Sequence, residues 1–86
     1  MEQHYLTNEQ IAAFASSLVR AERTPATIEK YLRSVRAFFL HLDGQPVTKD
    51  AVVAWKEHLQ RVDGYSPSTV SASLAALNDL FVFLGW

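Results

Sequence analysis

The chain has 86 residues, of which 49% are hydrophobic and 20% are charged, and this is the composition of one globular domain rather than of a disordered or fibrous chain. It contains no cysteine, which excludes disulfides and thiolate zinc sites. The formal net charge is −1, so the molecule as a whole has no electrostatic attraction to nucleic acid.

Two helices are predicted in the first half of the chain. The first begins after Thr7, an N-cap residue that forms a possible capping box with Gln10. The second begins TPAT, where Thr24 is the N-cap and Pro25 occupies the first helical position, at which its missing N–H costs nothing. The apolar stripes are Ile11, Phe14, Ala15 and Leu18 on the first helix, and Ile28, Leu32, Val35, Phe39 and Leu42, broadened by Tyr31 and Phe38, on the second. We expect Gly44 to end the second helix in a left-handed conformation.

Two further helices are predicted in the second half. The third begins at Thr48 and ends at Gly64. The fourth begins SPST, with Ser66 and Pro67 in the roles of Thr24 and Pro25, and Gly85 closes it. The stripes are Val52, Trp55, Leu59 and Val62 on the third helix, and Val70, Leu74, Leu77, Phe81 and Leu84 on the fourth.

The two halves of the chain match each other. The first helix corresponds to the third, and TPATIEKYLRSVRAFFLHL corresponds to SPSTVSASLAALNDLFVFL. Because the apolar stripes agree for several turns beyond the caps, we interpret the chain as one helical hairpin written twice. The predicted fold class is therefore all-α, a four-helix domain of two helical hairpins that spans residues 1–86 as a single domain.

Positive charge is concentrated on the second helix. Residues 20–36 hold five bases and two acids, whereas the rest of the chain is acidic. The face opposite the predicted stripe carries Ala26, Lys30, Arg33 and Ala37, with Ser34 and Arg36 at its flanks. A narrow cationic ridge fits phosphates and a DNA major groove. The alternative to a DNA-binding face is that these Lys and Arg residues only solvate the outside of an ordinary helix.

No catalytic or metal-binding constellation is predicted. His4, His41 and His58 are scattered without a paired helical spacing, so no metal site is expected. The three glycines are turn or helix terminators rather than parts of a phosphate-binding loop. Phe14 and Trp55 fall on the apolar stripes and are expected in the core. We therefore expect no catalytic residues, no metal and no cofactor.

The ordered set of caps and stripes resembles the N-terminal core-binding domain of tyrosine recombinases, the phage-integrase family, over nearly the whole chain. The positions that carry this resemblance are Thr24, Thr27, Ile28, Tyr31, Phe38, Phe39, Val47, Thr48, Trp55, Leu59, Ser66, Pro67, Thr69, Leu74, Ala76, Leu77, Leu80, Phe81 and Leu84.

The resemblance implies a non-catalytic, SAM-like domain of two crossed helical hairpins. Such a domain forms half of a clamp around double-stranded DNA during DNA integration or recombination. The catalytic domain of that family is separate and C-terminal, so we expect this chain to be a fragment of a recombinase, with an exposed Trp86 at its end, and to have the missing domain and other protomers as further partners. The implied DNA-binding residues are Arg23, Thr24, Ala26, Thr27, Lys30, Arg33, Arg36, Ser66, Ser68, Thr69, Ser71 and Ala72.

The fourth helix departs from the family pattern, because its corresponding face has no Lys or Arg. A second hypothesis is therefore a helical protein–protein module that docks through the smooth Ala72, Ala75 and Ala76 face or through Val82, Phe83 and Trp86. A small enzyme is a third, for which no residues can be named. The N-terminal segment has no apolar run, and LFVFL is far shorter than the ~20 residues of a membrane span, so no membrane partner is expected. The resemblance implies a cytoplasmic, bacterial or phage-encoded protein.

Overall fold

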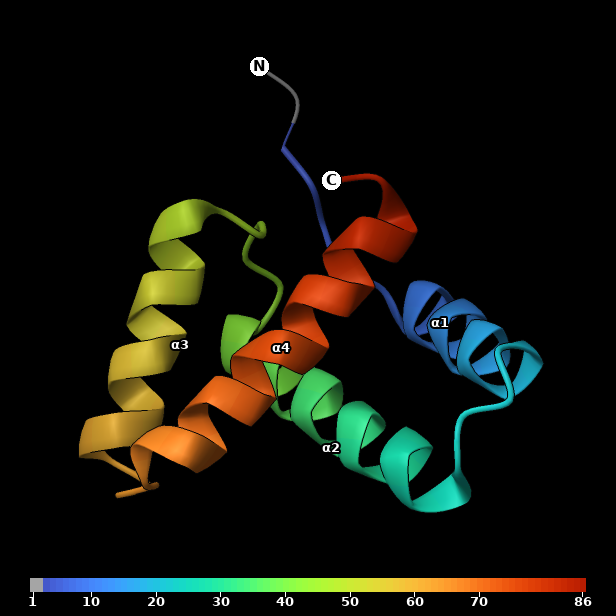
Figure 1. Cartoon of the computed structure of the whole chain (residues 1–86). Coiled ribbons are helices and arrows are strands. Elements are labelled where there is room, and N and C mark those ends of the chain that lie inside the picture. The colour runs from blue at the N-terminus through green and yellow to red at the C-terminus, as the bar shows by residue number, and fades with distance from the viewer. Residues whose placement is uncertain (1–2) are drawn as a thin grey trace.

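The computed structural model describes residues 3–86, which form four α-helices and no strand (Figure 1). The helices are α1 (Asn8–Arg20), α2 (Pro25–Leu42), α3 (Lys49–Arg61) and α4 (Pro67–Leu84). The all-α prediction is confirmed. Helices α1 and α3 each have 13 residues, and α2 and α4 each have 18, so the two predicted hairpins have equal dimensions.

Every helix begins at a hydroxyl side chain, as predicted. Each cap oxygen accepts a hydrogen bond from the backbone N–H three residues later, which satisfies one of the donors that a helix start leaves free. The pairs are Thr7 with Gln10 (3.2 Å), Thr24 with Thr27 (3.2 Å), Thr48 with Ala51 (3.0 Å) and Ser66 with Thr69 (3.4 Å). The capping box at Thr7 and Gln10 is confirmed.

Two of the predicted helix ends are corrected. Gly44 is left-handed as predicted, at a φ of 83°, but the C-cap of α2 is Asp43, which is also left-handed at a φ of 48°. A short polar side chain such as that of Asp tolerates the left-handed conformation, so the helix stops one residue early. Helix α3 ends at Arg61, well before Gly64, and Val62 is exposed rather than part of the core stripe. Gly85, at a φ of 76°, closes α4 as predicted.

The four helices form two crossed hairpins. In Figure 1, α4 runs across α2 in the middle of the molecule, while α1 and α3 lie on opposite sides of this crossing. Helices α2 and α4 pack on each other most extensively, and α1 and α3, both fully described, do not contact each other. The resulting body measures 34 × 34 × 17 Å and is therefore a flat slab.

The core lies where α2 and α4 cross. Val35 and Phe38 of α2 and Leu77 and Leu80 of α4 are completely buried there. The predicted stripe of α2 is rotated by this packing, because Phe38 is buried whereas Phe39 is half-buried. Ile28 and Leu32 are also only half-buried, and Leu40 is exposed. On α4, Ala76 belongs to the core, which removes it from the smooth alanine face that was expected to dock a partner.

The first and last segments of the described chain lie close together (Figure 1). The backbone N–H of Val47 donates to the carbonyl of His4 over 2.7 Å, and the ring of His4 stacks on Trp86 with 4.6 Å between the ring centroids. Trp86 also packs on Phe81 at 5.9 Å. The prediction of an exposed Trp86 is therefore wrong, because the side chain is half-buried between these neighbours.

Helix α4 is the most apolar of the four. By length and composition alone it is a candidate membrane span, which is weak evidence because the core helix of a water-soluble protein has the same properties. Five residues of α4 are buried and the helix packs against α1, α2 and α3, whereas Val82 and Phe83 near its end are exposed.

Candidate nucleic-acid interface

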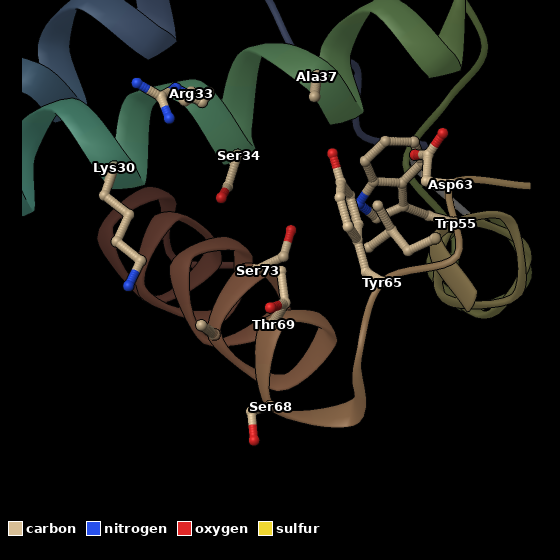
Figure 2. Close-up of a pocket in the computed structure, with 12 residues that line it drawn as sticks. Lys30, Arg33, Ser34, Ala37, Trp55, Asp63, Tyr65, Ser68, Thr69 and Ser73 are labelled. Atoms are coloured by element: carbon tan, nitrogen blue, oxygen red, sulfur yellow. The ribbon is translucent and has the colours of Figure 1, made fainter.

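An open groove runs between α2 and α4, with its end formed by α3 and the loop that follows α3 (Figure 2). It has a volume of about 470 Å³. Short side chains from both helices leave the space between them unfilled. They are Ser34 and Ala37 from α2 and Ala72 and Ser73 from α4. Five of the twelve predicted DNA-binding residues line it, namely Lys30, Arg33, Ser68, Thr69 and Ala72.

The cations of α2 differ in how free they are. The guanidinium of Arg33 lies 3.2 Å from a carboxylate oxygen of Glu29, and both side chains are largely exposed. Such a surface pair contributes little and is screened by salt, so it leaves Arg33 available to a phosphate. Lys30 and Arg36 make no ion pair within residues 3–86. In Figure 2, Lys30 extends toward α4 at one end of the groove.

The predicted cations are divided between two faces of α2. Arg23 and Arg36 line a separate groove of about 510 Å³ between the end of α1 and the start of α2. Its remaining lining is mainly apolar and includes Ile28 and Leu32, which the rotation of α2 left only half-buried. Arg23 and Arg36 therefore do not belong to the same concave surface as Lys30 and Arg33.

The hydroxyl residues at the helix starts are engaged locally. The hydroxyl of Thr24 donates to Oγ1 of Thr27 over 2.8 Å, and the hydroxyls of Ser66 and Thr69 are 3.1 Å apart. In both pairs the cap oxygen also accepts the backbone N–H at the third helical position. Five of the predicted DNA-binding residues line neither groove, although all of them are exposed or half-buried. They are Thr24, Ala26, Thr27, Ser66 and Ser71.

Seven of the twelve residues that line the main groove were not predicted as site residues, and Tyr65, Ser73 and Trp55 are the most informative of them. Tyr65 lies in the loop between α3 and α4, where no helical periodicity places a side chain. Ser73 is buried, and its position three residues after Val70 and four before Leu77 put it on the apolar face, which was a usable signal. Trp55 was assigned to the core, which is confirmed, but it also forms the floor of the groove.

Two histidines that look unrelated in the sequence are brought together. The rings of His41 on α2 and His58 on α3 are 5.0 Å apart, and both pack on Trp55. Nε2 of His58 also lies 3.8 Å from a carboxylate oxygen of Asp63. Within residues 3–86 no three His, Cys, Asp or Glu side chains are grouped so that they could hold a metal ion. His41, His58 and Trp55 thus form a cluster of aromatic rings, of which Trp55 lines the groove.

The comparisons with known proteins support one family. The family model described as "Phage integrase, N-terminal SAM-like domain" matches residues 6–86, which is nearly the whole chain. No curated protein and no solved structure matches the chain.

Proposed function

The chain belongs to the family of phage integrase N-terminal SAM-like domains, and from this premise we propose that it binds double-stranded DNA on behalf of a site-specific recombinase. The matched domain is not the catalytic domain of that family. In this proposal, a separate catalytic domain carries out strand cleavage and exchange. The present domain binds the duplex and positions it.

The groove between α2 and α4 is the observation that carries this proposal. It joins a cationic segment of one helix, at Lys30 and Arg33, to the hydroxyl-rich first turns of another, at Ser68 and Thr69. Lys, Arg, Ser and Thr side chains and helix N-termini are the groups that contact DNA phosphates in protein–DNA complexes. The cationic turns of α2 at Lys30 and Arg33 and the start of α4 thus offer a single surface with the chemistry of a backbone-contacting interface.

The dimensions of the molecule are compatible with a duplex. Its broad face is 34 Å in each direction, and one turn of B-DNA is about 34 Å long. One side of α2 carries two cations, Lys30 and Arg33, between two small residues, Ala26 and Ala37. A DNA major groove is about 12 Å wide and admits one helix. We infer that α2 supplies most phosphate contacts, whereas α4, which lacks Lys and Arg, fits against the DNA through small side chains.

Titration with a duplex of random sequence at low salt tests the proposal. Amide resonances at the starts of α2 and α4 should shift together. With about two to four phosphates neutralised, the logarithm of the binding constant should fall against the logarithm of salt concentration with a slope of roughly −2 to −4. The double variant Lys30→Ala/Arg33→Ala should lose most of the binding.

The matched control is Lys49→Ala/Lys56→Ala, which removes the same charge from α3 at positions outside the groove. It should bind nearly as well as the unmodified chain. Equal losses in the two double variants would mean that only net charge matters, and shifts scattered over the whole surface, or none at millimolar protein, would refute DNA binding through this groove.

A second candidate, a helical protein-interaction module, is favoured by one observation. Val82 and Phe83, near the end of α4, are exposed apolar side chains, and the face that they share is away from the groove. Self-association that is indifferent to salt and to DNA, and that the substitution Phe83→Ser abolishes, would favour this candidate.

A further inference from the structure

The indole nitrogen of Trp55 is unusual among the polar atoms of the protein. Trp55 is only 4% exposed, and its Nε1 is the one buried side-chain nitrogen or oxygen in residues 3–86 that has no hydrogen-bond partner. A buried donor without a partner costs about 1–3 kcal/mol. Buried Trp N–H groups usually find an acceptor, so this donor is left available to an acceptor from outside the chain.

Packing alone does not require an indole at this position. The equivalent residue in the first hairpin is Phe14, which is 2% exposed and occupies the same place on α1 that Trp55 occupies on α3. A benzene ring, with no polar atom, therefore fills the corresponding part of the core. The N–H of Trp55 is an addition that the fold does without in its other half.

The surroundings of this N–H combine an aromatic ring with both acceptors and donors. Trp55, Tyr65 and Asp63 all line the groove and are drawn at the same end of it in Figure 2. Tyr65 is 49% exposed, while its backbone is held by a hydrogen bond of 3.1 Å from its N–H to the carbonyl of Leu59. Because Nε1 of Trp55 is itself buried, an acceptor from outside reaches it only after a neighbouring side chain moves, and the exposed side chain of Tyr65 can do so without moving the loop. The hydroxyls of Ser34 and Ser73 point into the groove from opposite walls (Figure 2), and neither makes a hydrogen bond within residues 3–86.

The two ends of the groove differ in chemistry. Lys30 provides a cation at one end, whereas Trp55, Tyr65 and Asp63 are grouped at the other (Figure 2). The carboxylate of Asp63 disfavours an anion at the second end. A ligand that suits both ends has a phosphate at the first and a flat ring with mixed acceptor and donor edges at the second. This is the chemistry of a nucleotide, and single bases bind proteins by stacking on aromatic side chains.

We propose that the groove between α2 and α4 holds one unpaired nucleotide, with its phosphate at Lys30, its base against Tyr65 and a base acceptor on the indole N–H of Trp55. The proposal rests on the DNA-binding function proposed above and adds to it a preference for DNA in which a nucleotide has left the stack. Extruding a base from a duplex costs a few kcal/mol, so the site is filled most readily where a nucleotide is already unpaired.

The resonance of the Trp55 indole proton provides the test, because it reports on the donor itself. The chain has two tryptophans, and Trp86→Phe identifies the signal that remains as that of Trp55. The probes are a duplex with one bulged thymidine, the same duplex fully paired, and thymidine monophosphate. The bulged duplex should move the indole resonance to higher frequency and slow its exchange with water, and should bind about tenfold more tightly than the paired duplex, which corresponds to the lower part of the stacking energy of one base.

Two variants separate the contributions. Trp55→Phe keeps an aromatic ring of the kind that Phe14 provides but removes the N–H, and it should reduce the preference for the bulged duplex about threefold to tenfold, which is the effect of one neutral hydrogen bond. Tyr65→Ala should reduce it similarly by removing the stacking surface. The control Trp86→Phe should leave the preference unchanged. If Trp55→Phe does not fold, the indole resonance of the unmodified chain still decides.

The outcomes distinguish this proposal from the one on which it rests. An unmoved indole resonance and equal affinities for the two duplexes, together with shifted amides at the starts of α2 and α4, would overturn the nucleotide site and leave duplex binding intact. No shift with any DNA, together with a shift caused by thymidine monophosphate, would support the groove as a site for a free nucleotide and refute DNA binding. An equal indole shift with the fully paired duplex would overturn the requirement for an unpaired nucleotide.

Discussion

Phe38 is the largest of the side chains that are completely buried, and it lies where α2 and α4 cross. Its ring packs at 6.0 Å from Trp55 and at 6.3 Å from Phe81, so it links α2 to both α3 and α4. Its neighbour Phe39 is half-buried and makes no ring contact of this kind within the described residues.

The substitution Phe38→Leu should therefore destabilise the protein by about 1 kcal/mol or somewhat more, because a smaller aliphatic side chain leaves the crossing imperfectly packed. The same substitution at Phe39 should cost clearly less. Urea unfolding of both variants measures the difference. A loss at Phe39 that equals or exceeds the loss at Phe38 would contradict the rotated core.

The choice between these adjacent phenylalanines could not be made from the sequence. A period of 3.6 residues is compatible with Phe39 in line with Leu32 and Val35, and equally with Phe38 in line with Val35 and Leu42. What decides is the position of α4, which is a tertiary property. Tyr65 and the indole N–H of Trp55 were invisible as site groups for the same reason, because a loop side chain and a core side chain acquire a common groove only when the helices are assembled.

At the scale of the helices, the start signals were the most reliable part of the sequence. A hydroxyl residue followed by Pro starts a helix by two effects within one turn. The hydroxyl oxygen accepts a hydrogen bond from the third helical N–H, and the φ of Pro is fixed, so this signal depends on local geometry rather than on distant contacts. Helix ends were less predictable. Asp43 takes the left-handed position although Gly44, at a φ of 83°, follows it directly and is also left-handed.

The caps of α2 and α4 yield a prediction at this scale. Thr24→Ala removes the acceptor of the Thr27 N–H and should cost about 1 kcal/mol of stability, and Ser66→Ala should do the same at α4. Thr24→Ser and Ser66→Thr retain the oxygen and should be nearly neutral. Thermal unfolding compares the four variants. An alanine variant as stable as its hydroxyl counterpart would show that the proline alone fixes the helix start.

At the scale of the whole molecule, the two hairpins share one core. Because α1 and α3 do not touch, each hairpin is stabilised by what α2 and α4 bury against each other. The equivalence of the halves was readable from their matching patterns. The groove between α2 and α4 was not, because it depends on the angle at which the hairpins cross.

We therefore expect residues 1–45, prepared alone, not to fold. This fragment leaves Val35 and Phe38 without the α4 residues that cover them, and a chain of this length is close to the lower limit for an independent core. Its circular dichroism should show little helix and no cooperative thermal transition, whereas the whole chain should unfold in a single transition. A cooperative transition in the fragment would mean that the hairpins are separate folding units.

The meeting of His4 and Trp86 has a mechanical consequence. His4 and Trp86 lie together at the C-terminal end of α4, whereas the groove begins at the other end of that helix, near Ser68. The 18 residues of α4 are about 27 Å long. A polypeptide attached near His4 or Trp86 would thus anchor the domain at one place, and α4 would connect this anchor rigidly to the groove. A small turn at the anchor would sweep the groove through several ångströms, so the length and rigidity of the attachment govern how finely the groove can be aimed.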